Sequence, residues 1–252
     1  MKKVLFIGNS QIGALKAGWD QILKDDILHF ESYFAGVREQ VFFFSKLHDS
    51  HFCFREDLAD KLRSPLMFSW SNNSSSIDLS QFSKIIVAAG PSRRYLPLYV
   101  DPGKTFFPKI STSLLQDVIL YGRLSENSPM FRTAPVVFDL MRIFTRKIIF
   151  LGAPLPSETI KNKVICSDWK DEEILDLQGR INATCVDINA DDNYPIFFSP
   201  QQSLCDSLLS FTKHDYMQDG LRYDGKVNGD PYHANSSYGA MVIKSIARFI
   251  PR

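Results

Sequence analysis

The stretch Val4-Leu5-Phe6-Ile7-Gly8-Asn9-Ser10-Gln11 decides how this sequence folds. Four consecutive apolar residues that end at a glycine are typical of a short strand buried on both faces of a parallel sheet. We therefore predict a first strand over residues 2–8 and a helix over residues 11–23, where apolar side chains recur at spacings of three and four. Ser10 would then lie on the turn that leaves the carboxyl end of this strand.

Strands and helices are predicted to alternate along the rest of the chain. Apolar or alternating runs predict four further strands, at residues 27–34, 84–90, 146–151 and 183–188. Helical spacing of apolar positions predicts helices at residues 111–124, 135–144, 171–181, 200–211 and 237–249. This order predicts an α/β fold, a three-layer α/β/α sandwich with a mainly parallel five-stranded sheet of the flavodoxin-like kind.

A chain of 252 residues suits a single domain. We expect an insertion or cap at residues 37–76, with a small insertion or a hairpin region at residues 42–70 and a polar loop at residues 71–76. Residues 91–109 form a predicted long loop with four prolines, and loops of this length in compact domains are usually functional.

Composition narrows the classes of function. The net charge of +1 favours neither nucleic acid nor an anionic membrane surface as a partner. The chain has no run of the roughly 18 to 20 apolar residues that would span a bilayer, and its apolar start is too short for a signal peptide, so we expect a cytoplasmic protein. The four cysteines show no CxxC spacing, which predicts free thiols and no metal site.

The candidate catalytic residues lie near the two ends of the chain. Near the carboxyl end, Asp230-Pro231-Tyr232-His233 places a carboxylate three residues before an imidazole. With Ser10 as nucleophile, His233 as general base and Asp230 to orient the imidazole, these residues supply what nucleophilic acyl transfer requires. Asp224 is a competing acid, but the three-residue spacing favours Asp230.

Plainer interpretations exist for each residue taken alone. A serine after a strand is an ordinary helix cap. His48 and His51 are three residues apart, but no third metal ligand is evident. Arg93 and Arg94 are either a solvated pair or contacts for a carboxylate or phosphate of the substrate.

Taken together, the motifs resemble those of the SGNH (GDSL-like) hydrolase superfamily. Gly8-Asn9-Ser10-Gln11 is similar to the first block of that family, and Asp230-Pro231-Tyr232-His233 to its last block. Gly36 matches the glycine of the second block, and Gly90 that of the third. Residues 234–239 are similar to the polar loop that starts the final helix of the family.

The resemblance implies an oxyanion hole that includes the backbone amides of Ser10 and Gly36. The family has an asparagine two residues after the third-block glycine, whereas this chain has Ser92. Three alternatives follow: the Ser92 hydroxyl is a weaker donor, Arg93 donates in its place, or the third donor is missing. Loss of one oxyanion donor costs roughly 10²- to 10³-fold in turnover. We expect the same loops to supply substrate contacts, from Asn9, Gln11, Gly90, Arg93 and Arg94.

The resemblance implies a serine esterase that removes an O-acyl group, acetyl in the first instance, from a small molecule or a carbohydrate, without a cofactor. One alternative is an O-acetyltransferase of polysaccharide biosynthesis that uses acetyl-CoA as co-substrate. The other is a non-catalytic module that binds a sugar or nucleotide-sugar. The acyl group, the acceptor and the oligomeric state stay open.

Overall fold

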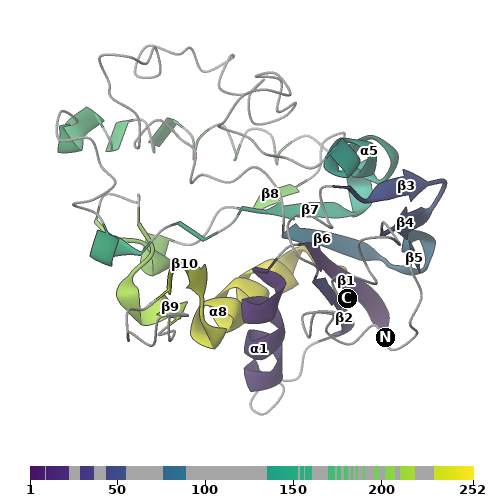
Figure 1. Cartoon of the computed structure of the whole chain (residues 1–252), viewed down its shortest axis with the longest axis horizontal. Helices are drawn as coiled ribbons and strands as arrows, with labels where there is room; N and C mark the ends of the chain where they lie inside the picture. The colour runs from purple at the N-terminus through teal and green to yellow at the C-terminus, as the bar shows by residue number, and fades with distance from the viewer. Residues whose placement is uncertain are drawn as a thin grey trace.

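A computed structural model describes residues 1–8, 10–22, 29–36, 44–54, 76–88, 135–152, 154–155, 157–160, 170–173, 175–176, 179–180, 183, 186, 190, 196–198, 202–207, 211–218 and 230–252. A five-stranded sheet lies at the centre (Figure 1), and each pair of neighbouring strands in it is parallel. In spatial order its strands are β2 (Phe30–Gly36), β1 (Lys2–Gly8), β6 (Lys84–Ala88), β7 (Ile148–Leu151) and β8 (Ile196–Phe198). The chain is therefore an α/β protein built on a parallel sheet.

Strand β1, which lies between β2 and β6, is buried on both faces, as its apolar run predicts. Val4 and Phe6 belong to the hydrophobic cluster on one face of the sheet, and Leu5 and Ile7 to the cluster on the other. All four side chains are fully buried, and burial of such side chains stabilises a fold by about 1.5–3 kcal/mol each. The alternation follows from the two-residue period of a strand.

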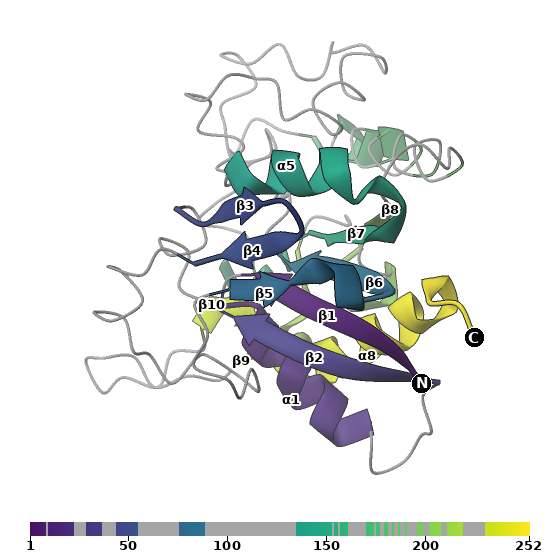
Figure 2. The ribbon, with the colours of Figure 1, turned by 90° about the vertical axis from the view of Figure 1, so that its right-hand side faces the viewer.

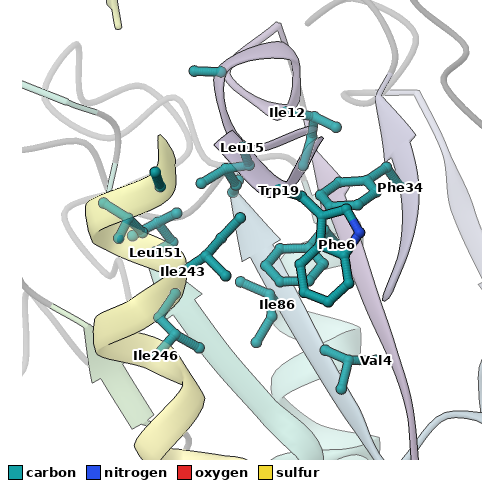
Figure 3. Packing of buried hydrophobic residues seen from close by; sticks show 14 of the residues in the cluster. Val4, Phe6, Ile12, Leu15, Trp19, Phe34, Ile86, Leu151, Ile243 and Ile246 are labelled. Carbon is teal, nitrogen blue, oxygen red and sulfur yellow. The ribbon is translucent and has the colours of Figure 1, made fainter. Parts of the chain in front are cut away.

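Helices α1 (Ile12–Ile22) and α8 (Ser236–Ile246) cover the first face of the sheet (Figures 1 and 2). The Trp19 ring of α1 lies 6.3 Å from the Phe34 ring, which in turn stacks on Phe6 at 4.8 Å. Figure 3 shows Ile243 and Ile246 of α8 directed into the same cluster. A short 3-10 turn, Ala247–Phe249, ends this last helix.

Helix α5 (Pro135–Ile143) and a small antiparallel sheet cover the second face (Figure 2). The strands of this small sheet are β3 (Lys46–His48), β4 (His51–Cys53) and β5 (Ser76–Asp78). Phe52 and Ile77 pair across β4 and β5 and are both fully buried against the main sheet. The region 37–76 therefore contains a hairpin, and Ser76, predicted in a loop, belongs to a strand.

Most predicted elements that fall on described residues agree with the structure. The first strand, the first helix, the strand that begins at residue 84 and the helix that begins at residue 135 are confirmed within one residue at their described ends. The last helix, predicted over residues 237–249, begins at Ser236 and ends at Ile246, and the 3-10 turn Ala247–Phe249 takes its last three predicted positions. The strand predicted at 27–34 begins at Phe30 and continues to Gly36. A 3-10 turn, Thr145–Lys147, occupies the start of the strand predicted at 146–151.

Two predicted elements are wrong. The strand predicted at residues 183–188 does not form, because its described residues 183 and 186 are helical, like those of the preceding stretch 171–180. The fifth strand is instead β8, a three-residue run too short to give a sequence signal. In place of the helix predicted at 200–211, the described residues form the 3-10 turn Gln202–Leu204 and an antiparallel bridge between Cys205 and Thr212. The helix predicted at 111–124 and the loop at 91–109 lie outside the described residues.

The segment around His233 is a strand, although it is rich in residues that favour turns. Strand β10 (Asp230–Ala234) pairs with β9 (Met217–Gln218) in a separate two-stranded antiparallel sheet. Three further 3-10 turns complete the described structure: Leu79–Gln81, Glu158–Ile160 and His214–Tyr216. Among the residues described, no helix is both long enough and apolar enough to cross a membrane.

Candidate functional site

The site lies where the direction of the sheet's strand order changes. From β1 the chain passes to β2 on one side and then returns to β6 on the other side of β1. In open parallel sheets, such a switch point leaves a crevice beyond the carboxyl ends of the two central strands. Here those ends are Gly8 of β1 and Ala88 of β6, which pair in register.

Gly8 is required by the close approach of these two strand ends. A Cβ atom built on Gly8 would collide with the carbonyl group of Ala88. Any other residue at position 8 would therefore push β1 and β6 apart at the edge where the next residues turn away from the sheet. The close packing of β1 against β6 is therefore sufficient to explain the glycine of the Gly-Asn-Ser motif.

Ser10 lies in the turn between β1 and α1. Its carbonyl oxygen accepts a hydrogen bond from the backbone amide of Gly13 at 3.2 Å, which begins the first turn of the helix. The Ser10 side chain is half-buried. The serine is thus held by the backbone on both sides while its hydroxyl can reach a neighbouring side chain.

That neighbour is His233. Ser10 Oγ lies 2.8 Å from His233 Nε2, although 223 positions separate the two residues in sequence. With the imidazole proton on Nδ1, Nε2 accepts the hydrogen bond that the hydroxyl donates. The structure therefore brings together the nucleophile and the base predicted from the two ends of the chain, at a distance suited to proton transfer.

Small residues bring the two ends together by letting α1 and α8 pack closely. A Cβ on Gly18 would collide with the backbone of Gly239 and Ala240, and a Cβ on Gly239 would collide with the carbonyl of Ala14. Ser10 lies just before the amino end of α1, and His233 just before that of α8. The spacing of the two helices therefore fixes the spacing of the two side chains.

The other predicted members of the site are only partly described. Asp230 is the first residue of β10, where its backbone pairs with Gln218, and its side chain lies outside the description. Gly36 is buried at the end of β2, in register with Gly8, at the same edge of the sheet as Ser10. The remaining predicted site residues lie outside the described residues: Asn9, Gly90, Ser92, Arg93 and Arg94, together with the competing acid Asp224.

Gln11, which we predict to contact substrate, is almost fully buried. It lines a small cavity, with room for about one water molecule, between the two helices and the carboxyl ends of β6 and β7. The cavity is lined by Gln11, Ala14, Leu15, Ala88, Leu151, Gly152, Pro154 and Tyr238. Gln11 therefore belongs to the packing between α1 and α8 as much as to the crevice.

The clearest electrostatic feature of the described residues lies away from this edge, at Asp78. Hydrogen bonds from Ser80 hold the pKa of the Asp78 carboxyl below its usual value, with smaller contributions from Ser50 and His51. Within the described part of the chain, no group of three or more His, Cys, Asp or Glu side chains could hold a metal ion.

Gly18 is not singled out by the sequence, and Gly239 and Asn235 stand out only as members of the loop at residues 234–239, without a packing or capping role. Asn235 just before an apolar helical pattern is a helix-cap signal that the sequence does contain. The two glycines, by contrast, are ordinary helix residues until the partner helix is known.

No protein-family model matches the sequence, and a search of curated proteins finds no significant match.

Proposed function

We propose that this chain is a serine-dependent acyl-ester hydrolase of the SGNH type, with Ser10 as nucleophile and His233 as general base. The observation that carries the proposal is the 2.8 Å contact between Ser10 Oγ and His233 Nε2 at the switch point of a parallel sheet. A serine hydroxyl is a poor nucleophile until a base accepts its proton, and a base at this distance does so without rearrangement.

The reaction follows the usual course of acyl transfer. Ser10 Oγ attacks the ester carbonyl carbon while its proton passes to His233 Nε2. The tetrahedral adduct collapses, His233 returns the proton to the leaving alcohol, and the acyl group stays on Ser10 Oγ. Water then attacks the acyl-serine with His233 again as base, which releases the carboxylic acid and restores the hydroxyl.

The groups that assist this chemistry are proposed from the resemblance. Asp230 orients the imidazole through Nδ1, so that Nε2 faces the serine. The backbone amides of Ser10 and Gly36 donate to the developing oxyanion, with Ser92 as the weaker third donor. The position of Gly36 at the same sheet edge as Ser10 supports its role.

The strand order supports a fold assignment more specific than α/β. The order β2-β1-β6-β7-β8 is that of flavodoxin-like sheets, with α1 and α8 on one face and α5 on the other. We therefore propose a three-layer α/β/α sandwich of the SGNH kind, whose second face also carries the small sheet β3-β4-β5. An acetyl ester, of a small molecule or a carbohydrate, is the proposed substrate, and no cofactor is needed for the reaction.

The test is the hydrolysis of p-nitrophenyl acetate by the wild type and by Ser10→Ala. We expect the wild type to release p-nitrophenol with saturation, and Ser10→Ala to lose this activity without a change in its unfolding curve. Ser83→Ala is the matched control, because Ser83 lies just before β6, where its hydroxyl donates to the carbonyl of Lys3 at 2.9 Å.

Equal turnover by the wild type and Ser10→Ala would overturn the assignment of the nucleophile. No turnover by a folded wild type, with acetyl esters of sugars tested as well, would favour the non-catalytic binding module.

A further inference from the structure

Asn235 joins the amino end of α8 to the segment 215–217. Its Nδ2 donates to the carbonyl oxygens of Asp215, at 2.7 Å, and Met217, at 3.1 Å. Its Oδ1 accepts from the backbone amide of Tyr238 at 3.1 Å, which caps the helix. Its own backbone amide donates to the carbonyl oxygen of Tyr216 at 2.9 Å.

The segment that Asn235 holds is itself tied to the main sheet. The hydroxyl of Thr212 donates to the carbonyl of Leu155 at 2.8 Å, and the amide of Glu158 donates to the carbonyl of Thr212 at 3.0 Å. The Glu158 carboxylate accepts from the amide of His214 at 3.0 Å. Leu155 and Glu158 follow β7, so these bonds connect the 212–217 segment to the carboxyl edge of the sheet.

The backbone ladder of β10 is irregular at His233. Asp230 pairs with Gln218 and Ala234 with Met217, and the register shifts between these two pairs. His233 lies inside the shifted part, so regular pairing does not set its position. Asn235, two residues further on, attaches the same stretch of backbone to the segment 215–217, which is bonded to the residues that follow β7.

We propose that Asn235 is a positioning residue that holds His233 against Ser10, beyond its role as a helix cap. The inference rests on the proposed function, because the position of His233 matters most if it acts as the base. The amide of Asn235 is suited to both tasks: its oxygen caps the helix, and its nitrogen fixes the helix start to the carbonyls of residues 215 and 217.

Substitutions separate the two tasks. Serine and aspartate cap helices about as well as asparagine, but neither can donate to two carbonyl oxygens in this geometry. Asn235→Ser and Asn235→Asp therefore keep the cap and lose the two side-chain bonds to residues 215 and 217, whereas Asn235→Ala loses both the cap and these bonds, and the backbone bond to Tyr216 remains in all three variants. Asp78→Ala is the matched control, because it removes a cap on the other face of the sheet and does not touch His233.

The experiment compares these variants by three measurements. The first is the rate at which a fluorophosphonate labels the protein, and the second is the split between kcat and KM with p-nitrophenyl acetate. The third is the NMR signals of the His233 imidazole nitrogens, with Ser10→Ala as reference for a broken contact. All are measured well below the unfolding temperature of each variant.

We expect Asn235→Ser and Asn235→Asp to lower the labelling rate and kcat about 10- to 100-fold with little change in KM, since small displacements of a catalytic group cost rates of this size. Their His233 signals should move in the same direction as those of Ser10→Ala. Asp78→Ala should lower stability but keep the wild-type labelling rate, kcat and His233 signals.

Wild-type labelling rates and His233 signals in Asn235→Ser and Asn235→Asp would overturn the inference and leave Asn235 a helix cap. Failure of the proposed function gives a different pattern. If the wild type neither labels nor turns over, but the His233 signals of Asn235→Ser still follow those of Ser10→Ala, the positioning role stands without the hydrolase.

Discussion

At the scale of the residue, the central feature is one hydrogen bond between residues at opposite ends of the chain. Each of the two residues has an ordinary explanation alone, since Ser10 precedes a helix and His233 lies in a short strand. Neither explanation requires Ser10 Oγ and His233 Nε2 to lie 2.8 Å apart. This hydrogen bond therefore supports the proposed function more strongly than either motif does alone.

His233→Ala tests the role of the imidazole. If His233 is the general base, the substitution should lower kcat for p-nitrophenyl acetate by roughly 10²- to 10⁴-fold. KM should change little, because the ring acts on the serine proton rather than on substrate binding. Steady-state kinetics give both constants.

His29→Ala is the matched control for that variant. His29 is also part-buried, and its Nε2 lies 2.9 Å from the carbonyl oxygen of Ile250, at the opposite edge of the sheet. Its removal should leave kcat unchanged. A similar loss in both variants would mean that the effect of His233→Ala is a loss of folding.

At the scale of the element, the contact between α1 and α8 determines the site. Gly239→Ala places a methyl group against the carbonyl of Ala14, where no space exists. We expect a loss of about 1–3 kcal/mol in the free energy of unfolding, as for other overpacked positions. The labelling rate of Ser10 should fall as well, because the helices must separate. Urea denaturation and fluorophosphonate labelling measure the two effects.

Gly179→Ala provides the contrast within the same chain. Gly179 is helical and exposed, and a Cβ there would meet nothing within 4 Å. Alanine should stabilise this position by roughly 0.5–1 kcal/mol, since glycine is costly within a helix. If Gly239→Ala were equally harmless, the close packing of α1 and α8 would not be what sets the site.

The small sheet gives a pH-dependent prediction at Asp78. Hydrogen bonds from Ser80 lower the pKa of this carboxyl in the folded protein, so the folded state binds the proton less tightly than the unfolded chain. Its contribution to stability is present above the usual pKa of 3.8 and is lost as the pH falls through the lower folded value. The stability difference between the wild type and Asp78→Asn should therefore shrink below that pH, as measured by urea denaturation. A difference that stays constant on acidification would contradict the role of the carboxylate.

At the scale of the whole molecule, the small sheet and the helices enclose the main sheet from its two faces. Phe52 of β4 is fully buried in the cluster that contains Leu5 and Ile7 of β1. Phe52→Ala should cost about 3–5 kcal/mol, as for other buried aromatic side chains. Because this cluster includes the central strand, unfolding should remain one transition by both fluorescence and circular dichroism. Two separate transitions would show that residues 44–54 fold independently of the main sheet.

The sequence predicts the elements whose pattern is local. Strand β1 and helix α1 follow from an apolar run and from helical spacing. The contact between Ser10 and His233 does not follow from such a pattern, because His233 lies in a separate antiparallel sheet and reaches Ser10 through the packing of α1 against α8. What the sequence cannot show depends on partners far along the chain. His51 pairs with Asp78 across the small sheet, and Asn235 donates to residues about twenty positions earlier. The three residues of β8 form a strand only because β7 lies beside them.

The most direct test of the central claim is to find where a fluorophosphonate attaches. The wild type, Ser10→Ala and His233→Ala are treated with the probe, digested and analysed by peptide mass spectrometry. If His233 activates Ser10, the label appears on the peptide that contains Ser10, is absent in Ser10→Ala and forms much more slowly in His233→Ala. Labelling of another serine, or labelling at Ser10 that is just as fast without His233, would contradict the claim.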